Sequence, residues 1–132
     1  MPRPDLRELG AIFAGGVAGA LLRTALTNWL TAGAASWPWA VFAINVSGAF
    51  ILGYVVTRLQ ERLPLSTYRR ALVGTGFCGA YTTFSTMETE LLEMLRAGQI
   101  GLAAGYAAAS IAAGYLAVYA ATVIARRIRV LR

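Results

Sequence analysis

The sequence contains no histidine, no lysine and only one cysteine, Cys78. A single cysteine excludes an intramolecular disulfide and a cysteine-based zinc site. Neither a nucleophile–base pair nor a cluster of metal ligands is visible, so most hydrolytic and redox chemistry has little support. We therefore expect that the protein is not an enzyme.

Charge is also scarce. Charged residues make up 14% of the 132 residues, whereas soluble proteins carry roughly a quarter. Hydrophobic residues make up 58% of the chain. Too few polar residues remain to cover a water-soluble core, and the composition therefore favours a small membrane protein.

Four long and mostly apolar runs define the expected architecture. A bilayer-spanning helix needs about 20 such residues. The sequence predicts an all-α membrane protein whose single transmembrane domain occupies residues 1–132, and no cleaved signal peptide is expected. The expected spans cover residues 9–30, 37–57, 71–95 and 100–125.

The arginines are distributed very unevenly between the two sides that four spans define. Ten of the twelve arginines lie in the N-terminal segment, the second loop or the C-terminal segment. Only Arg23 and Arg96 belong to the other side. The positive-inside rule then predicts a multi-pass protein of the cell inner membrane with both termini in the cytoplasm. The net charge of +6 reflects topology, and no nucleic-acid partner is expected.

The third span has an unusual composition. Three glycines lie within residues 74–79, and four hydroxyl side chains follow within residues 82–86. Glycine weakens a helix, and Ser and Thr side chains can satisfy the backbone groups that a break releases. We therefore predict a break near residues 76–82, with a kinked packing helix as the alternative. Irregular backbone at membrane depth lies within protein or lines a wet cavity, where discontinuous helices direct carbonyls at ions.

Small and acidic residues have simpler interpretations. Gly15 and Gly19 are four residues apart, which predicts that another helix approaches this face closely. Glu88 and Glu93 are interpreted as a solvated helix end. Cys78 is interpreted as a small packing residue, because no neighbouring cation would activate its thiol.

Polar side chains inside the other spans allow two interpretations each. The amide of Asn45 either bonds a neighbouring helix or contacts a permeating species, and its NH₂ group suits an anion. Arg23 either reaches the headgroups or raises the local potential for an anion. Tyr106 and Ser110 are four residues apart and share one helix face.

These residues resemble the Fluc fluoride channels, also called CrcB. The third-span run is similar to the family's signature, which is close to G-x-x-G-G-x-T-T-F-S-T-F. The resemblance covers all four spans, in order and with matching spacing. The matching positions are residues 15–23, Pro38-Trp39, Asn45, Gly48, residues 74–86, Tyr106 and Ser110.

The resemblance implies four-helix subunits that pair antiparallel into a dimer with two pores and a structural Na⁺ at its centre. It implies that the backbone carbonyls of Gly79 and Thr82 hold this Na⁺, and it implies no organic cofactor. A ring of Phe84 suits the pathway because its edge carries positive potential. The implied fluoride pathway consists of Arg23, Asn45, Phe84, Ser85, Thr86, Met87, Tyr106 and Ser110.

Two departures from the family pattern affect these implications. The family's second phenylalanine falls at Met87, and its second glycine falls at Ala80. The arginine bias is a further difference, because an antiparallel homodimer with dual topology favours nearly balanced charge. We hypothesise that the chain is half of a heterodimer with an oppositely inserted homologue, and self-pairing is the alternative.

The sequence thus predicts a passive, fluoride-selective channel that exports fluoride from the cytoplasm and lowers its toxicity. A small multidrug-type transporter is one alternative, but it needs a carboxylate within the membrane. The first, second and fourth spans have none, and Glu90 lies near a helix end. A non-transporting assembly subunit is the other alternative, and it does not explain the composition of the third span.

Overall fold

A computed structural model describes residues 5–30, 36–62 and 67–128, and all regular structure within these residues is helical. The prediction of an all-α membrane protein is therefore confirmed. The elements are α1 (Leu6–Trp29), α2 (Trp39–Arg62), α3 (Thr67–Arg69), the π-helical η1 (Arg70–Cys78), α4 (Gly79–Tyr81), α5 (Phe84–Arg96) and α6 (Ile100–Arg127).

Three of the helices are long and apolar enough to cross a bilayer by length and composition. They are Leu6–Trp29, Trp39–Leu59 and Ile100–Arg127, which agree with three of the four expected spans. The third expected span is divided among shorter helices. Most side chains on the long helices are not buried by this chain alone, as expected for surfaces that meet lipid or another subunit.

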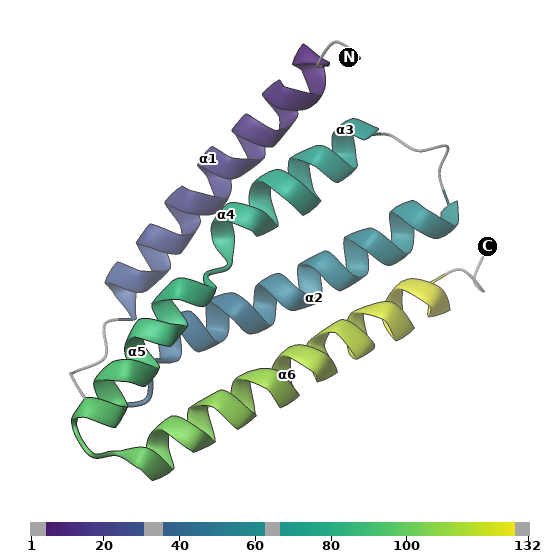
Figure 1. Cartoon of the computed structure of the whole chain (residues 1–132). Helices are drawn as coiled ribbons and strands as arrows, with labels where there is room; N and C mark the ends of the chain where they lie inside the picture. Colours follow the sequence, from purple (N-terminus) through teal and green to yellow (C-terminus); the bar gives the residue numbers. More distant parts are fainter. Residues whose placement is uncertain (1–4, 31–35, 63–66, 129–132) are drawn as a thin grey trace.

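The helices form two adjacent pairs (Figure 1). Helix α1 packs along the stretch from α3 to α4, and α2 packs along α6. At one end of the bundle lie the start of α1, the end of α2, the start of α3 and the end of α6. The chain therefore crosses the bundle four times, as the sequence predicts.

Glycines allow α1 to lie directly against the third span. A Cβ atom on Gly15 would collide with the carbonyl oxygen of Leu72, and one on Gly19 would collide with that of Phe77. Gly76 meets a backbone carbonyl of α1 in the same way. The close approach predicted for the first span is thus confirmed, because only residues without a side chain fit between these backbones.

We predict that Gly15→Ala destabilises the protein by roughly 1–3 kcal/mol, because the added methyl group has no space. The matched control is Gly10→Ala on the same helix, where a Cβ atom meets nothing within 4 Å. This control should stabilise the helix by roughly 0.5–1 kcal/mol. Thermal unfolding in detergent measures both, and equal unfolding temperatures for the two variants would contradict the packing described here.

The second helix pair also has a close contact. A Cβ atom on Gly53 would lie 3.2 Å from the Cα atom of Val118. One turn further, the Thr57 hydroxyl donates to Thr122 at 3.4 Å. Helices α2 and α6 therefore keep a fixed register, and this register places Tyr106 of α6 beside the start of α2.

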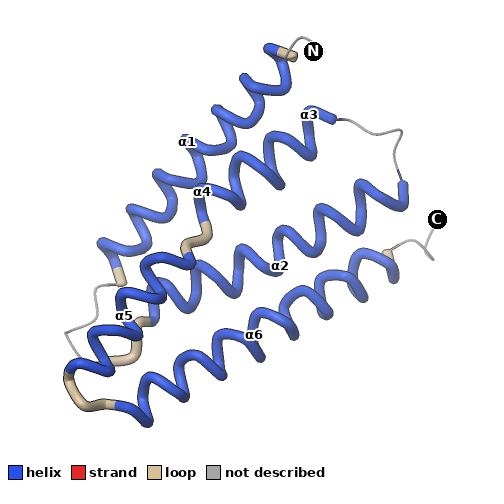
Figure 2. Tube along the Cα trace, viewed as in Figure 1, coloured by secondary structure: helices blue, strands red, loops and turns tan. Residues whose placement is uncertain are grey.

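The third span is interrupted at Thr82 and Thr83, whose backbones are extended (Figure 2). The break thus begins at the C-terminal end of the predicted range of residues 76–82, and residues 76–81 before it are helical. The glycines at 74–79 occupy a wide π-helical turn and the short helix α4. Gly76 serves close packing against α1, so its presence does not itself mark the break. Long π-helical segments are rare, and π-turns occur frequently at functional sites.

Outside the spans, Asp5 caps α1 and joins it to α3. Its carboxylate accepts a hydrogen bond from the Arg7 amide at 2.9 Å and another from the Tyr68 hydroxyl at 3.0 Å. These two donors hold the pKa of Asp5 below its ordinary value. The contact fixes the start of α1 against the start of the third span.

Candidate functional site

The amide of Asn45 holds the break in the third span. Its Nδ2 atom donates to the Thr83 carbonyl at 2.9 Å, and the Thr83 amide donates to Asn45 Oδ1 at 2.9 Å. The side chain therefore pairs with an extended backbone as a neighbouring strand would. Of the two interpretations of Asn45, the bond to a neighbouring helix is present. An amide NH₂ has two hydrogens, so one N–H remains for another acceptor.

The pairing at Thr83 releases two carbonyl groups. In a continuous α-helix the amide of each residue donates to the carbonyl four positions earlier. The Thr83 amide would then donate to the Gly79 carbonyl, and the Thr86 amide would donate to the Thr82 carbonyl. The Thr83 amide instead donates to Asn45, and the Thr86 amide donates to the Thr83 hydroxyl at 3.3 Å. Both carbonyls therefore lack their helical donor, and carbonyl oxygens are ligands that hard cations accept.

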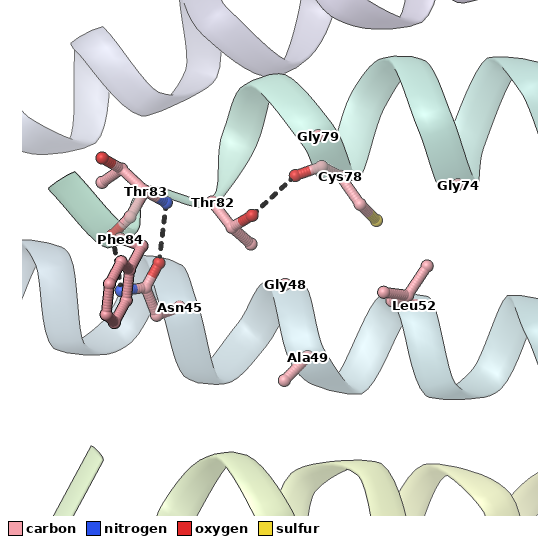
Figure 3. A pocket seen from close by; sticks show the side chains of 10 residues that line it. All are labelled: Asn45, Gly48, Ala49, Leu52, Gly74, Cys78, Gly79, Thr82, Thr83 and Phe84. Atoms are coloured by element: carbon pink, nitrogen blue, oxygen red, sulfur yellow. Dashed lines mark hydrogen bonds between the residues drawn. The ribbon is translucent and has the colours of Figure 1, made fainter. Parts of the chain in front are cut away.

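A cavity of about 390 Å³ lies at the break (Figure 3). Helix α2 contributes Asn45 and Gly48, and the third span contributes Gly79 and Thr82. Phe84 also lines this cavity and is 67% exposed, so the described residues leave most of it uncovered. The two carbonyls released by the break thus belong to residues at one cavity. Carbonyl oxygens are a donor type that a hard cation accepts, and the Na⁺ site that the family resemblance implies stays a prediction.

A second, more polar cavity of about 310 Å³ lies on the α1 side of the same break. Arg23 lines it together with Ser85 and Thr86, the first hydroxyl residues of α5. The Thr83 hydroxyl lies 2.9 Å from that of Thr86 and lines this cavity as well. Thr83 therefore belongs to both cavities and separates them. Arg23 supplies the positive charge of the second one.

Tyr106 stands apart from both cavities, in a buried cluster between α5 and α6. Its ring is fully buried, and its hydroxyl donates to Glu90 Oε2 at 2.8 Å. Met87 packs against this cluster with its side chain partly buried. One turn beyond Tyr106, the Ser110 hydroxyl is buried and has no partner among the described residues.

The predicted pathway residues thus occupy three neighbouring places. Asn45 and Phe84 lie at the first cavity, and Arg23, Ser85 and Thr86 lie at the second. Met87 and Tyr106 lie in the buried cluster, with Ser110 one turn beyond. A single chain does not bring all eight residues to one cavity. Their role in conduction stays a prediction.

Sequence reasoning did not include Thr83 or Glu90 among the site residues. Thr83 is the N-cap of α5 and connects both cavities. Threonine before a helix that begins at the next residue is a common cap signal. Glu90 lies three residues after Met87 and four before the buried Met94, on the inward face of α5. The neighbouring Glu88 and Glu93 are exposed, as predicted.

Comparisons with known proteins agree on one family. A family model described as "CrcB-like protein, Camphor Resistance (CrcB)" matches residues 10–122. A relative from Mycolicibacterium paratuberculosis, named "Fluoride-specific ion channel FluC 1", is 58% identical over 132 residues and covers all of both chains. A relative of the same name from Mycobacterium bovis is 56% identical over the same length. The relative "Fluoride-specific ion channel FluC" from Acidobacterium capsulatum is 43% identical over 86% of this chain and 92% of its own.

Proposed function

The chain belongs to the CrcB family of fluoride ion channels and is not an enzyme, and we propose that it lets fluoride leave the cytoplasm passively. The observation that supports this most directly is the break in the third span, held by Asn45 beside Phe84. A continuous helix would keep the Thr83 backbone bonded within the third span and would leave nothing at this point to hold the Asn45 amide beside Phe84. No coupling to an energy source is invoked, because transport down the fluoride gradient lowers cytoplasmic fluoride by itself.

Neutral donors suit the conduction of a small anion. The remaining N–H of Asn45, the ring edge of Phe84 and the hydroxyl of Ser110 each bind fluoride only weakly. An ion that is held too tightly does not leave, so a series of weak sites favours rapid passage. Arg23, beside Ser85 and Thr86, would draw the anion toward the break by its charge.

We propose that two copies of this fold pair antiparallel and complete the pathway. The support is that Phe84 is largely uncovered at the first cavity, while Tyr106 is buried elsewhere in the same chain. A partner across a two-fold axis would cover the open cavity. The carbonyls of Gly79 and Thr82 from both copies would then hold a Na⁺, whose charge would fix the two breaks against each other.

The proposal is tested in a bacterium whose own fluoride channels have been deleted. This chain is expressed together with a homologue from its own genome, which supplies the partner subunit if the dimer is a heterodimer. Expression should restore growth in fluoride to that of the parent strain. A control culture with equal chloride should show no difference. Continued fluoride sensitivity, despite folded protein in the inner membrane, would contradict fluoride export.

We further propose that the partner is an oppositely inserted homologue. The support is the distribution of arginines, ten on one side and two on the other, which commits the chain to one orientation with both termini in the cytoplasm. We predict that epitope tags at either terminus react only after the inner membrane is opened. Tags that react from both sides in comparable amounts would show dual topology and favour self-pairing.

A further inference from the structure

The indole of Trp37 carries a buried N–H that meets no hydrogen-bond acceptor within residues 5–30, 36–62 and 67–128. Trp37 lies just before α2, and its Nε1 atom is buried without a partner among the described residues. Most buried donors in proteins are paired, so an unpaired donor calls for an explanation. Trp39, two residues on, is 61% exposed and has no such buried N–H. The two tryptophans therefore differ in what their N–H groups can reach.

The surroundings of Trp37 are the cluster that contains Tyr106. The Trp37 ring lies 5.4 Å from the Tyr106 ring at an interplanar angle of 79°. It lies 5.5 Å from the ring of Phe42 at 72°. Met87 packs against the same cluster. Trp37 and Met87, the position that departs from the family pattern, thus pack against one buried cluster that contains the predicted pathway residue Tyr106.

The chemistry of these neighbours is complementary. The side chain of Met87 has neither an N–H nor a ring edge with positive potential, so it offers no donor to an anion. Tryptophan donates and does not accept, whereas fluoride only accepts. The indole N–H of Trp37 is therefore suited to replace the positive ring edge that a phenylalanine at position 87 would provide. Both side chains pack against the same cluster.

We propose that the Trp37 N–H contacts fluoride as the ion passes Tyr106, and that it compensates for Met87. This inference rests on the proposed fluoride conduction. The alternative is that the N–H faces the π-system of Phe42 or Tyr106 as a weak hydrogen bond and has only a structural role. The two interpretations differ in what happens to the fluoride flux when a substitution removes the N–H but keeps an aromatic ring at position 37.

The test compares four forms of the full chain in lipid vesicles, together with the partner subunit if one is required. Trp37→Phe should lower the fluoride efflux rate about fivefold, the effect of one lost hydrogen bond. The matched control Trp39→Phe should stay within about twofold of the unmodified chain, as surface substitutions usually do. Trp37→Phe combined with Met87→Phe should recover most of the rate, because the new ring provides the missing edge.

A spectroscopic measurement covers the case in which Trp37→Phe does not fold. In the variant with Trp29→Phe and Trp39→Phe, Trp37 is the single tryptophan, and fluoride should change its emission while equal chloride should not. Unchanged emission with fluoride would contradict the contact, as would full efflux from Trp37→Phe or equal losses in both tryptophan variants. An unmodified chain that conducts no fluoride would instead contradict the proposed function, so the two failures are distinct.

Discussion

Asn45→Asp should lower fluoride efflux at least about 100-fold. A fixed negative charge about 4 Å from the path raises the energy of a passing anion by about 4 kcal/mol at an effective dielectric constant near 20, and each 1.4 kcal/mol is a factor of ten. The substitution also removes the Nδ2 donor, which bonds the Thr83 carbonyl at 2.9 Å. Efflux from vesicles measures the effect, and an undiminished rate would remove Asn45 from the pathway.

A control variant separates the charge effect from loss of the bond that supports the break. Ser47 lies on the same helix, and its hydroxyl is 2.9 Å from that of Tyr81 in the third span. Ser47→Ala removes this contact without adding charge and should cost about 1 kcal/mol of stability. It should leave fluoride efflux nearly unchanged. If Ser47→Ala reduced efflux as strongly as Asn45→Asp, the structure of the third span, and not charge, would explain both.

Phe84→Leu should lower fluoride efflux about tenfold or more, because leucine keeps most of the apolar volume but loses the positive ring edge. The ring is 67% exposed in this chain, so little packing within the chain is lost. Phe13→Leu is the matched control, because Phe13 is 74% exposed and lies on α1 outside both cavities. A Phe84→Leu variant as fast as the Phe13→Leu control would contradict an anion-facing role for Phe84.

Much of the fold follows from apolar runs, because the bilayer sets both the length and the composition of a spanning helix. Three spans agree with long helices within a few residues. The break begins only at the end of the predicted range, because glycine has two roles in membrane helices. Gly76 allows close contact with α1, while the helix ends at Tyr81 and the backbone becomes extended at Thr82.

The site was predicted less completely than the fold. The pattern of hydroxyls identified Ser85 and Thr86, but it could not show that Thr83 would adjoin both cavities. Nor could the sequence choose between the two interpretations of Asn45, because its partner lies 38 residues away in the chain. The sequence places Glu90 near a helix end, but it could not show that the Glu90 carboxylate accepts a hydrogen bond from the buried Tyr106.

The most direct test of fluoride conduction is efflux from sealed lipid vesicles that contain the purified protein. Vesicles are loaded with fluoride or chloride, and each ion is followed with its own electrode, for the chain alone and together with its nearest homologue. We expect rapid fluoride efflux without an energy source, and chloride efflux slower by orders of magnitude. Efflux from the chain alone would favour self-pairing. No fluoride efflux from either preparation, or chloride efflux as fast as fluoride, would contradict a fluoride-selective channel.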